Sequence, residues 1–100
     1  MEIDFEKEVI NASKKELIIV DFYADWCGPC KMLGPILEKL SKESKVKLIK
    51  LNVDNEKKIA EELDIMSVPT VVFFKDGEPK DFFVGAYPEP KIKEFIEKYR

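Results

Sequence analysis

The chain has 100 residues, of which 45% are hydrophobic and 37% are charged, and its net charge is −3. A chain of this length builds one compact hydrophobic core, so we expect a single domain over residues 1–100. The charges form no basic block for phosphates, and no segment has the composition of a secretory signal or a membrane span, so we expect a cytoplasmic protein that binds neither nucleic acid nor membranes.

The first half of the chain predicts a helix, a strand and a second helix. Asp4 can cap a first helix that extends to about Lys15, with apolar residues at helical spacing. Residues 17–24 form an almost unbroken apolar run rich in β-branched and aromatic side chains, which is typical of a central strand covered on both faces. Residues 32–44 follow as an amphipathic helix, which Pro35 should kink near its first turns.

The rest of the chain predicts a strand, a short helix, a β-hairpin and a final helix. These segments lie at residues 46–53, around 59–63, at 70–74 with 82–84, and at 92–99. Asp54 or Asn55 can cap the short helix, and Asp76-Gly77 supplies the turn of the hairpin. Helices that alternate with strands before a terminal hairpin predict an open α/β sheet with helices on both faces.

The two cysteines of the chain lie in the sequence Cys27-Gly28-Pro29-Cys30, between the buried strand and the helix that follows it. We therefore expect the thiols at the carboxyl edge of the sheet. A zinc site needs about four ligands, and the chain has no histidine and no third cysteine, so we expect no metal. A structural disulfide across so short a loop is worth only about 1.9 kcal/mol, and a reducing cytosol would open it. Redox exchange is the interpretation that fits the pair.

The start of the helix indicates which cysteine reacts first. A free thiol with a pKa of about 8.5 is only about 3% thiolate near neutral pH. Unsatisfied N–H groups and the helix dipole favour the anion, and a modest lowering of the pKa would raise that fraction to about a quarter. Pro29 fits the first helical turn, which places Cys30 inside the helix and Cys27 at its exposed mouth. We expect Cys27 to attack and Cys30 to resolve.

Asp21 interrupts the apolar run of the buried strand. With a period of two it shares a face with Leu17 and Ile19, which places its carboxyl group between sheet and helix; the alternative is that it marks the solvated end of the strand. Burial without a strong partner raises a carboxyl pKa by up to about 3 to 5 units. Asp21 would then accept the proton of Cys30 as that thiol becomes a thiolate. Lys50, on the next strand, is either the nearest cation or a solvated strand lysine.

Several stretches together resemble the thioredoxin family: VDFYADWCGPCKMLGPIL, KLNVD, SVPTVVFFKDGE and VGA. The similarity runs from about residue 17 to the C-terminus. It implies a thioredoxin-like α/β fold with a central mixed sheet of four to five strands and helices on both faces. Only residues 1–3 are available for the first edge strand of the family, so we expect that strand to be short or absent.

The resemblance also implies a function. The protein would be a general protein-disulfide reductase whose redox group is the Cys27–Cys30 couple, with no bound cofactor. Asp21 and Lys50 match the buried acid of the family and its lysine partner. The implied substrates are proteins that contain a disulfide, and the implied electron donor is a thioredoxin reductase. We expect the protein to be a monomer.

The resemblance also implies a docking surface for substrates, because members of the family meet their partners with a flat, weakly polar surface. The matching positions are Trp26, Gly28, Pro29, Val68, Pro69, Gly85 and Ala86. Pro69 falls on the cis-proline of the family, which would help the Val68 backbone to dock an extended peptide. Gly-Pro between the cysteines, without a histidine, favours a reductant over an oxidase, and glutaredoxins typically have Pro-Tyr there. An interaction module or assembly subunit with incidental thiols is the alternative from another functional class.

Overall fold

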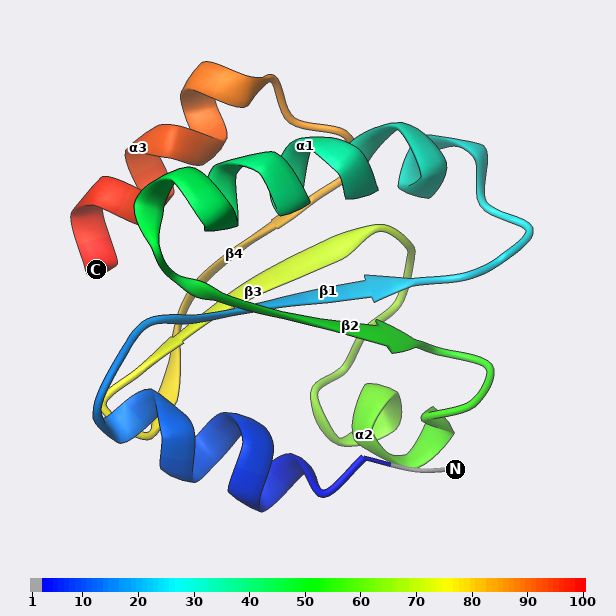
Figure 1. The fold of residues 1–100 in the computed structure, drawn as a ribbon. Helices are drawn as coiled ribbons and strands as arrows, with labels where there is room; N and C mark the ends of the chain where they lie inside the picture. Colours follow the sequence, from blue (N-terminus) through cyan, green and yellow to red (C-terminus); the bar gives the residue numbers. More distant parts are fainter. Residues whose placement is uncertain (1–2) are drawn as a thin grey trace.

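The apolar runs of the sequence form a four-stranded mixed sheet in the order β2-β1-β3-β4 (Figure 1). The strands are β1 (Ile18–Tyr23), β2 (Lys47–Asn52), β3 (Thr70–Lys75) and β4 (Glu78–Val84). β1 pairs in parallel with β2 and antiparallel with β3, and β3 pairs antiparallel with β4. The computed structural model describes residues 3–100. The edge strand considered at residues 1–3 lies largely outside this range, and Ile3 itself is not in a strand.

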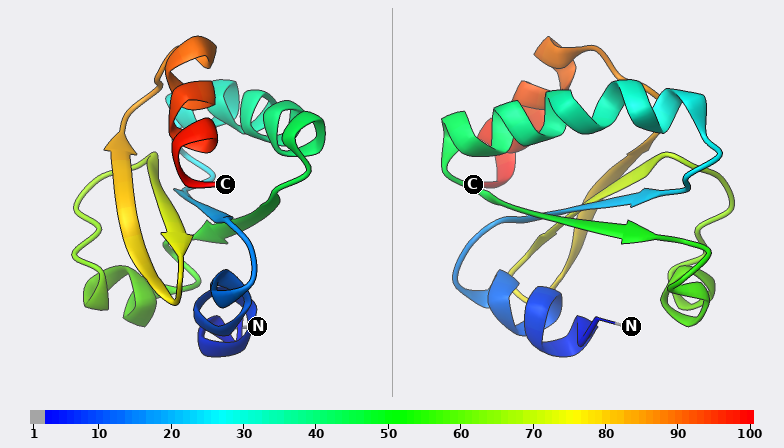
Figure 2. Two further views of the ribbon diagram at one scale, coloured as in Figure 1. Left: turned by 90° about the vertical axis from the view of Figure 1, so that its left-hand side faces the viewer. Right: turned by 45° about the vertical axis from the view of Figure 1, so that its right-hand side comes forward.

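Helices cover both faces of the sheet, which confirms the predicted fold class (Figures 1 and 2). α1 (Gly28–Ser44) and α3 (Glu89–Tyr99) lie on one face. The other face carries α2 (Lys57–Glu62) and the N-terminal helical segment, which consists of a π-helical stretch η1 (Glu6–Asn11) and a 3₁₀ turn η2 (Ala12–Lys14). The predicted first helix is therefore present, with a wider and then a tighter winding than a regular α-helix.

The side chains of β1 alternate between two separate hydrophobic cores. The core under α1 and α3 contains Leu17, Ile19, Leu33, Leu37, Leu40, Val71, Phe73, Phe83, Ile92 and Ile96. The core on the opposite face contains Val9, Ile18, Val20, Phe22, Leu51, Val72 and Phe74. Because successive strand residues point to opposite faces, Asp21 falls on the α1 side of the sheet.

β4 begins at Glu78, earlier than the expected start of the return strand at residue 82. Proline is unfavourable within a sheet because it cannot donate to the β ladder, but an edge strand tolerates it. β4 is such an edge strand, and Pro79 lies opposite Phe74 next to a register shift between Phe73 and Phe74. The pairing of β3 with β4 therefore continues up to the Asp76-Gly77 turn.

The expected capping of α2 by Asp54 or Asn55 is wrong. Glu56 occupies the N-cap position of this helix and makes no side-chain cap. Asp54 and Asn55 belong to the turn after β2, where the Asp54 amide donates to the side-chain oxygen of Asn52 at 2.8 Å. The Glu56 carboxylate instead accepts a hydrogen bond from the Ile3 amide at 2.8 Å. This contact ties the N-terminal segment to the start of α2.

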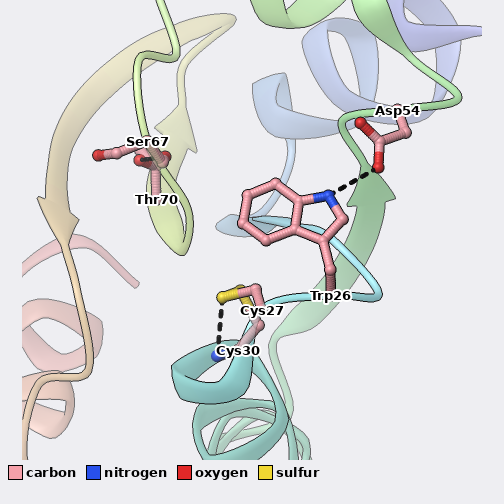
Figure 3. Close-up of a disulfide and its surroundings, with 6 residues drawn as sticks. All are labelled: Trp26, Cys27, Cys30, Asp54, Ser67 and Thr70. Atoms are coloured by element: carbon pink, nitrogen blue, oxygen red, sulfur yellow. Dashed lines mark hydrogen bonds between the residues drawn. A yellow bond between two sulfur atoms is a disulfide. The ribbon is translucent and has the colours of Figure 1, made fainter.

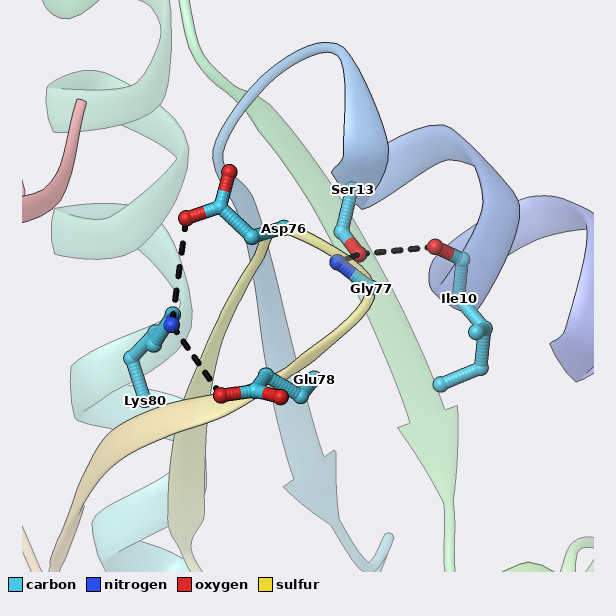
Figure 4. Close-up of polar contacts among 6 residues, drawn as sticks. All are labelled: Ile10, Ser13, Asp76, Gly77, Glu78 and Lys80. Atoms are coloured by element: carbon cyan, nitrogen blue, oxygen red, sulfur yellow. Dashed lines mark hydrogen bonds and ion pairs between the residues drawn. The ribbon is translucent and has the colours of Figure 1, made fainter.

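Ser13 anchors the β3–β4 turn to the N-terminal segment (Figure 4). Asp76 and Gly77 have φ angles of 58° and 82°, the left-handed conformation that two-residue hairpin turns require. The Ser13 carbonyl accepts a hydrogen bond from the Asp76 amide at 2.8 Å. Its hydroxyl accepts one from the Gly77 amide at 3.0 Å and donates to the Ile10 carbonyl at 2.8 Å. Ser13 is fully buried, so its hydroxyl satisfies backbone groups that have little access to water.

We expect Ser13→Ala to lower the free energy of unfolding by roughly 1 to 3 kcal/mol, because the Gly77 amide would lose its acceptor. Guanidinium unfolding of parent and variant measures this difference. Ser44→Ala is the matched control, since Ser44 lies at the end of α1 and takes no part in the turn, and its effect should stay within about 0.5 kcal/mol. Equal losses in the two variants would contradict the anchoring role.

Candidate active site

Cys27 and Cys30 form a disulfide at the start of α1 (Figure 3). Cys27 is the N-cap residue, and Pro29 lies in the first turn, where its missing N–H costs nothing. The two Cα atoms are 5.3 Å apart. The Cys30 amide donates to the Cys27 sulfur at 3.2 Å. This amide is one of the free donors of the helix start, so a negative charge on the Cys27 sulfur would be stabilised there.

The expected exposure of Cys27 is wrong for this disulfide-bonded form. The relative exposure of Cys27 is 4%, and that of Cys30 is 6%. The two cysteines pack in a small cluster with Ala24, against which Tyr23, Val53 and Val68 lie. Helix geometry fixes the position of Cys27 at the helix mouth, but its exposure depends on neighbours from distant parts of the chain. Only a small part of Cys27 is therefore accessible to a partner in this form.

The positions assigned to docking come from three segments around the disulfide. Trp26, Gly28 and Pro29 flank the first cysteine, Val68 and Pro69 precede β3, and Gly85 and Ala86 follow β4. Trp26, Gly28, Pro29 and Ala86 are exposed, Val68 and Gly85 are half-buried, and Pro69 is buried. The three segments are joined, because Val68 packs against the cysteine cluster and the Gly85 amide donates to the Pro69 carbonyl at 2.9 Å.

The loop before β3 has a defined conformation. The peptide bond between Val68 and Pro69 is cis. The Thr70 hydroxyl donates to the Ser67 carbonyl at 2.7 Å, which closes the loop on itself. Figure 3 shows this loop on one side of the disulfide and the Trp26 ring on the other.

Asp54 holds the side chain of Trp26, a contact that the sequence analysis missed. The indole Nε1 donates to Asp54 Oδ2 at 3.1 Å, although the Trp26 side chain remains 72% exposed (Figure 3). The signal was available in the sequence, because Asp54 comes two residues after the end of β2, the strand parallel to β1, and so reaches the same edge of the sheet. This hydrogen bond orients the exposed indole ring next to Cys27.

A cavity of about 300 Å³ brings Asp21 and Cys30 together, with Glu38 and Lys50 also in its wall. Asp21 is 1% exposed, and its Oδ1 accepts no hydrogen bond from residues 3–100. Burial raises the pKa of Asp21 to about 6, although the nearby Lys50 charge lowers it and the Glu38 charge adds to the rise. The carboxyl group can therefore gain or lose a proton close to neutral pH.

Lys50 lies directly opposite Asp21 in the register of β1 and β2. Its ammonium group nevertheless pairs with Glu38, whose Oε1 lies 3.6 Å from the Lys50 Nζ. Glu38 was not among the site residues predicted from the sequence. Its signal is helical spacing, because Cys30, Gly34 and Glu38 follow one another at i, i+4 and therefore share one face of α1.

Residues 3–100 contain neither a candidate metal site nor a helix that could span a membrane. Within this range, His, Cys, Asp and Glu side chains form no group of three or more that could hold a metal ion. In the same part of the chain, no helix has the length and apolar character needed to cross a bilayer.

Comparison with known sequences identifies one family. A family model for thioredoxin matches residues 1–98. A thioredoxin of Rickettsia felis is 44% identical over 96 residues, which cover 94% of this chain and 90% of that protein. The chloroplastic M-type thioredoxin of Pisum sativum is 46% identical over 104 residues, and this chain spans 60% of its length.

Solved structures give the same result. The thioredoxin of Fasciola hepatica matches with a TM-score of 0.84 at 42% identity, over 91% of this chain and 88% of that one. A thioredoxin of Nicotiana alata matches with a TM-score of 0.82 at 36% identity, over 91% of this chain and 81% of that one. Because the likeness in both sequence and structure extends over nearly the whole chain, this protein belongs to the thioredoxin family of thiol–disulfide oxidoreductases.

Proposed function

We propose that the protein is a general reductant of protein disulfides, with Cys27 as nucleophile and Cys30 as resolving thiol. The observation that carries this assignment is the place of Cys27 at the N-cap of α1, where its sulfur accepts a hydrogen bond from the Cys30 amide. A lowered thiol pKa is already known for thioredoxins as a class. The N-cap geometry supplies its physical cause here, because free N–H groups and the helix dipole favour the thiolate.

The proposed exchange has two displacement steps. In the reduced protein, the Cys27 thiolate attacks one sulfur of the target disulfide, the target S–S bond breaks, and the second target sulfur leaves as a thiolate. Cys30 then loses its proton and attacks the Cys27 sulfur, which releases the first target sulfur as a thiolate. Two electrons have passed to the target, and the Cys27–Cys30 disulfide remains.

Asp21 is the proposed proton acceptor for Cys30. The two side chains line the same cavity, whose volume of about 300 Å³ is large enough for water to relay the proton. Burial raises the pKa of Asp21 to about 6, which brings it closer to that of a thiol than an ordinary carboxyl group would be. The charge of Lys50 favours the ionised carboxylate that accepts the proton.

An extended segment of the target would dock across Trp26, Gly28, Pro29, Val68, Pro69, Gly85 and Ala86. Val68 packs against the cysteine cluster, so a segment that pairs with its backbone would carry its own disulfide to Cys27. The exposed Trp26 ring and the flat glycine and alanine positions offer apolar contact that does not select one sequence, which suits a general reductant.

We also propose how the couple is used in the cell. A thioredoxin reductase would return electrons to the Cys27–Cys30 disulfide, and no bound cofactor is needed because the two sulfurs carry both electrons. The protein would act as a monomer of one domain in the cytoplasm. The relative from Pisum sativum is chloroplastic, so the compartment is a prediction separate from the chemistry.

Reduction of insulin tests the roles of the two cysteines. Cys27→Ser should lower the rate by about 100-fold or more, because a hydroxyl is a far weaker nucleophile than a thiolate. Cys30→Ser should complete the first step and then stall as a covalent adduct with the target, which mass spectrometry detects. Activity equal to that of the parent in Cys27→Ser would overturn the reductase assignment in favour of an interaction module.

The role of Asp21 is tested by single-turnover release of the target from the mixed disulfide. Asp21→Asn should slow this step by roughly 10- to 100-fold near neutral pH, because Cys30 loses its proton acceptor. The difference should shrink toward a pH of about 8.5, where a thiol ionises without help. An unchanged rate near neutral pH would remove the proposed role.

The burial of Asp21 also predicts a cost in stability. The unfolded chain releases this proton near pH 3.8 and the folded protein near pH 6, so the parent loses stability as the pH rises between these values. Asp21→Asn should therefore raise the free energy of unfolding of the oxidised protein by up to about 3 kcal/mol above that range, and by nothing below it. Guanidinium unfolding at about pH 3.5 and about pH 7.5 measures the gain. A gain that does not depend on pH would contradict this origin.

A further inference from the structure

The ion pair between Lys50 and Glu38 is not explained by the exchange chemistry alone. We propose that Glu38 is a positioning residue, which holds the Lys50 ammonium at α1 and out of a direct ion pair with Asp21, and so sets the pH range in which Asp21 serves as a base. This inference rests on the proposed role of Asp21 as proton acceptor. It concerns the arrangement of charges behind the disulfide and not the docking surface.

The register of the sheet makes Asp21 the obvious partner for Lys50. Residues that face each other on adjacent strands are only about 5 Å apart, well within the reach of a lysine side chain. Among the residues that the structure describes, however, the ion pair of Lys50 goes to Glu38 alone, with 3.6 Å between Nζ and Oε1. Asp21 Oδ1 is left without a hydrogen bond from any of these residues. The Lys50 ammonium group is therefore paired with Glu38 on α1 and not with Asp21, its partner in the strand register.

Hydration explains why Glu38 competes successfully with Asp21. The side chains of Lys50 and Glu38 are 40% and 52% exposed, whereas Asp21 is 1% exposed. Pairing with Asp21 would strip water from the ammonium group, and the desolvation cost can exceed the Coulomb gain. Pairing with Glu38 leaves both charges in contact with water.

Two further observations locate the ammonium group at the cavity wall. A Cβ atom at Gly34 would lie 3.5 Å from the Lys50 Nζ, which shows that the ammonium group rests close to the backbone of α1. The same nitrogen lies 5.4 Å from the centroid of the Tyr23 ring, within the range of a cation–π interaction. The ammonium group therefore lies at the cavity wall, beside Glu38, Gly34 and Tyr23.

The other titratable groups at the cavity do not influence the ionisation of Asp21 in the same way. Asp25 and Lys31 also line it, but both are exposed and their charges oppose each other. The remaining titratable groups in the wall are the Tyr23 hydroxyl on β1 and the Cys30 thiol on α1. The pairing of Lys50 is therefore the charge arrangement that a single substitution on α1 can change.

The sign of the effect follows from two influences that act in the same direction. The negative charge of Glu38 disfavours a second negative charge on Asp21, and it also keeps the Lys50 ammonium out of a direct ion pair, in which Lys50 would favour that charge more strongly than it does from its present position. Replacement of Glu38 by a neutral residue removes the first influence and releases Lys50 toward Asp21. The ionisation of Asp21 should then occur at lower pH.

The test is a titration of the Asp21 carboxyl carbon by NMR, together with the pH profile of target release. In Glu38→Gln both should move to lower pH by roughly 0.5 pH unit or more. Glu38→Asp, which keeps the charge, should move them less. Glu43→Gln is the matched control, because it makes the same charge change at an exposed position of α1 that does not line the cavity, and it should leave both unchanged. An unmoved titration in Glu38→Gln, or an equal movement in Glu43→Gln, would overturn the proposal.

A second comparison separates positioning from the direct charge effect. In a Lys50→Met background there is no ammonium to release, so Glu38→Gln should move the Asp21 titration by less than about half of its effect in the parent. An equal movement in the two backgrounds would overturn the positioning role. An unmoved titration leaves the reductase assignment intact, whereas an Asp21→Asn protein as fast as the parent overturns the proton-acceptor role itself. Circular dichroism of each variant shows that the fold is retained.

Discussion

The burial of β1 on both faces is the constraint on which the site depends. β1 has hydrogen-bonded neighbours on both edges and a hydrophobic core against each face. A shift of one residue would exchange the two sets of side chains and turn Asp21 toward the α2 face, away from the disulfide. The two cores forbid that shift. They therefore fix the carboxyl group on the α1 side and fix the point at which the chain leaves the sheet to form Cys27 and α1.

The same helix, α1, has opposite effects on the ionisation of two groups, the Cys27 thiol and the Asp21 carboxyl. The start of α1 favours the charged form of the first thiol, because a free amide reaches the Cys27 sulfur. Burial under the same helix favours the neutral form of the Asp21 carboxyl and raises its pKa to about 6. Acid–base exchange is most effective between groups whose pKa values lie close together and close to the working pH. The raised pKa of Asp21 brings its carboxyl group closer to that condition for its proposed partner, the Cys30 thiol, whereas the start of α1 acts on Cys27.

Local pattern predicted most of the fold, and contacts between distant segments account for what was missed at the site. The period of two in β1 placed Asp21 in the layer under α1, and the mixed sheet with helices on both faces followed from the order of elements. Pro35 lies within α1 without ending it. The burial of Cys27 depends on Val68 from a distant loop, and the pairing of Glu38 depends on how α1 lies over β2, so neither could be found from spacing alone.

The lack of a direct ion pair between Lys50 and Asp21 lowers the stability of the folded protein. A pKa of about 6 in the folded protein implies that an ionised Asp21 lowers the free energy of unfolding by up to about 3 kcal/mol near neutral pH, a sizeable part of the roughly 5 to 15 kcal/mol that stabilises a domain. A direct Asp21–Lys50 pair would reduce that cost, since an opposite charge favours the carboxylate. It would also return the carboxyl group toward its ordinary acidity and remove its affinity for the proton of Cys30. In the proposed mechanism, the same unpaired, buried carboxyl group weakens the fold and makes the second thiol easier to ionise, so relieving the first effect would remove the second.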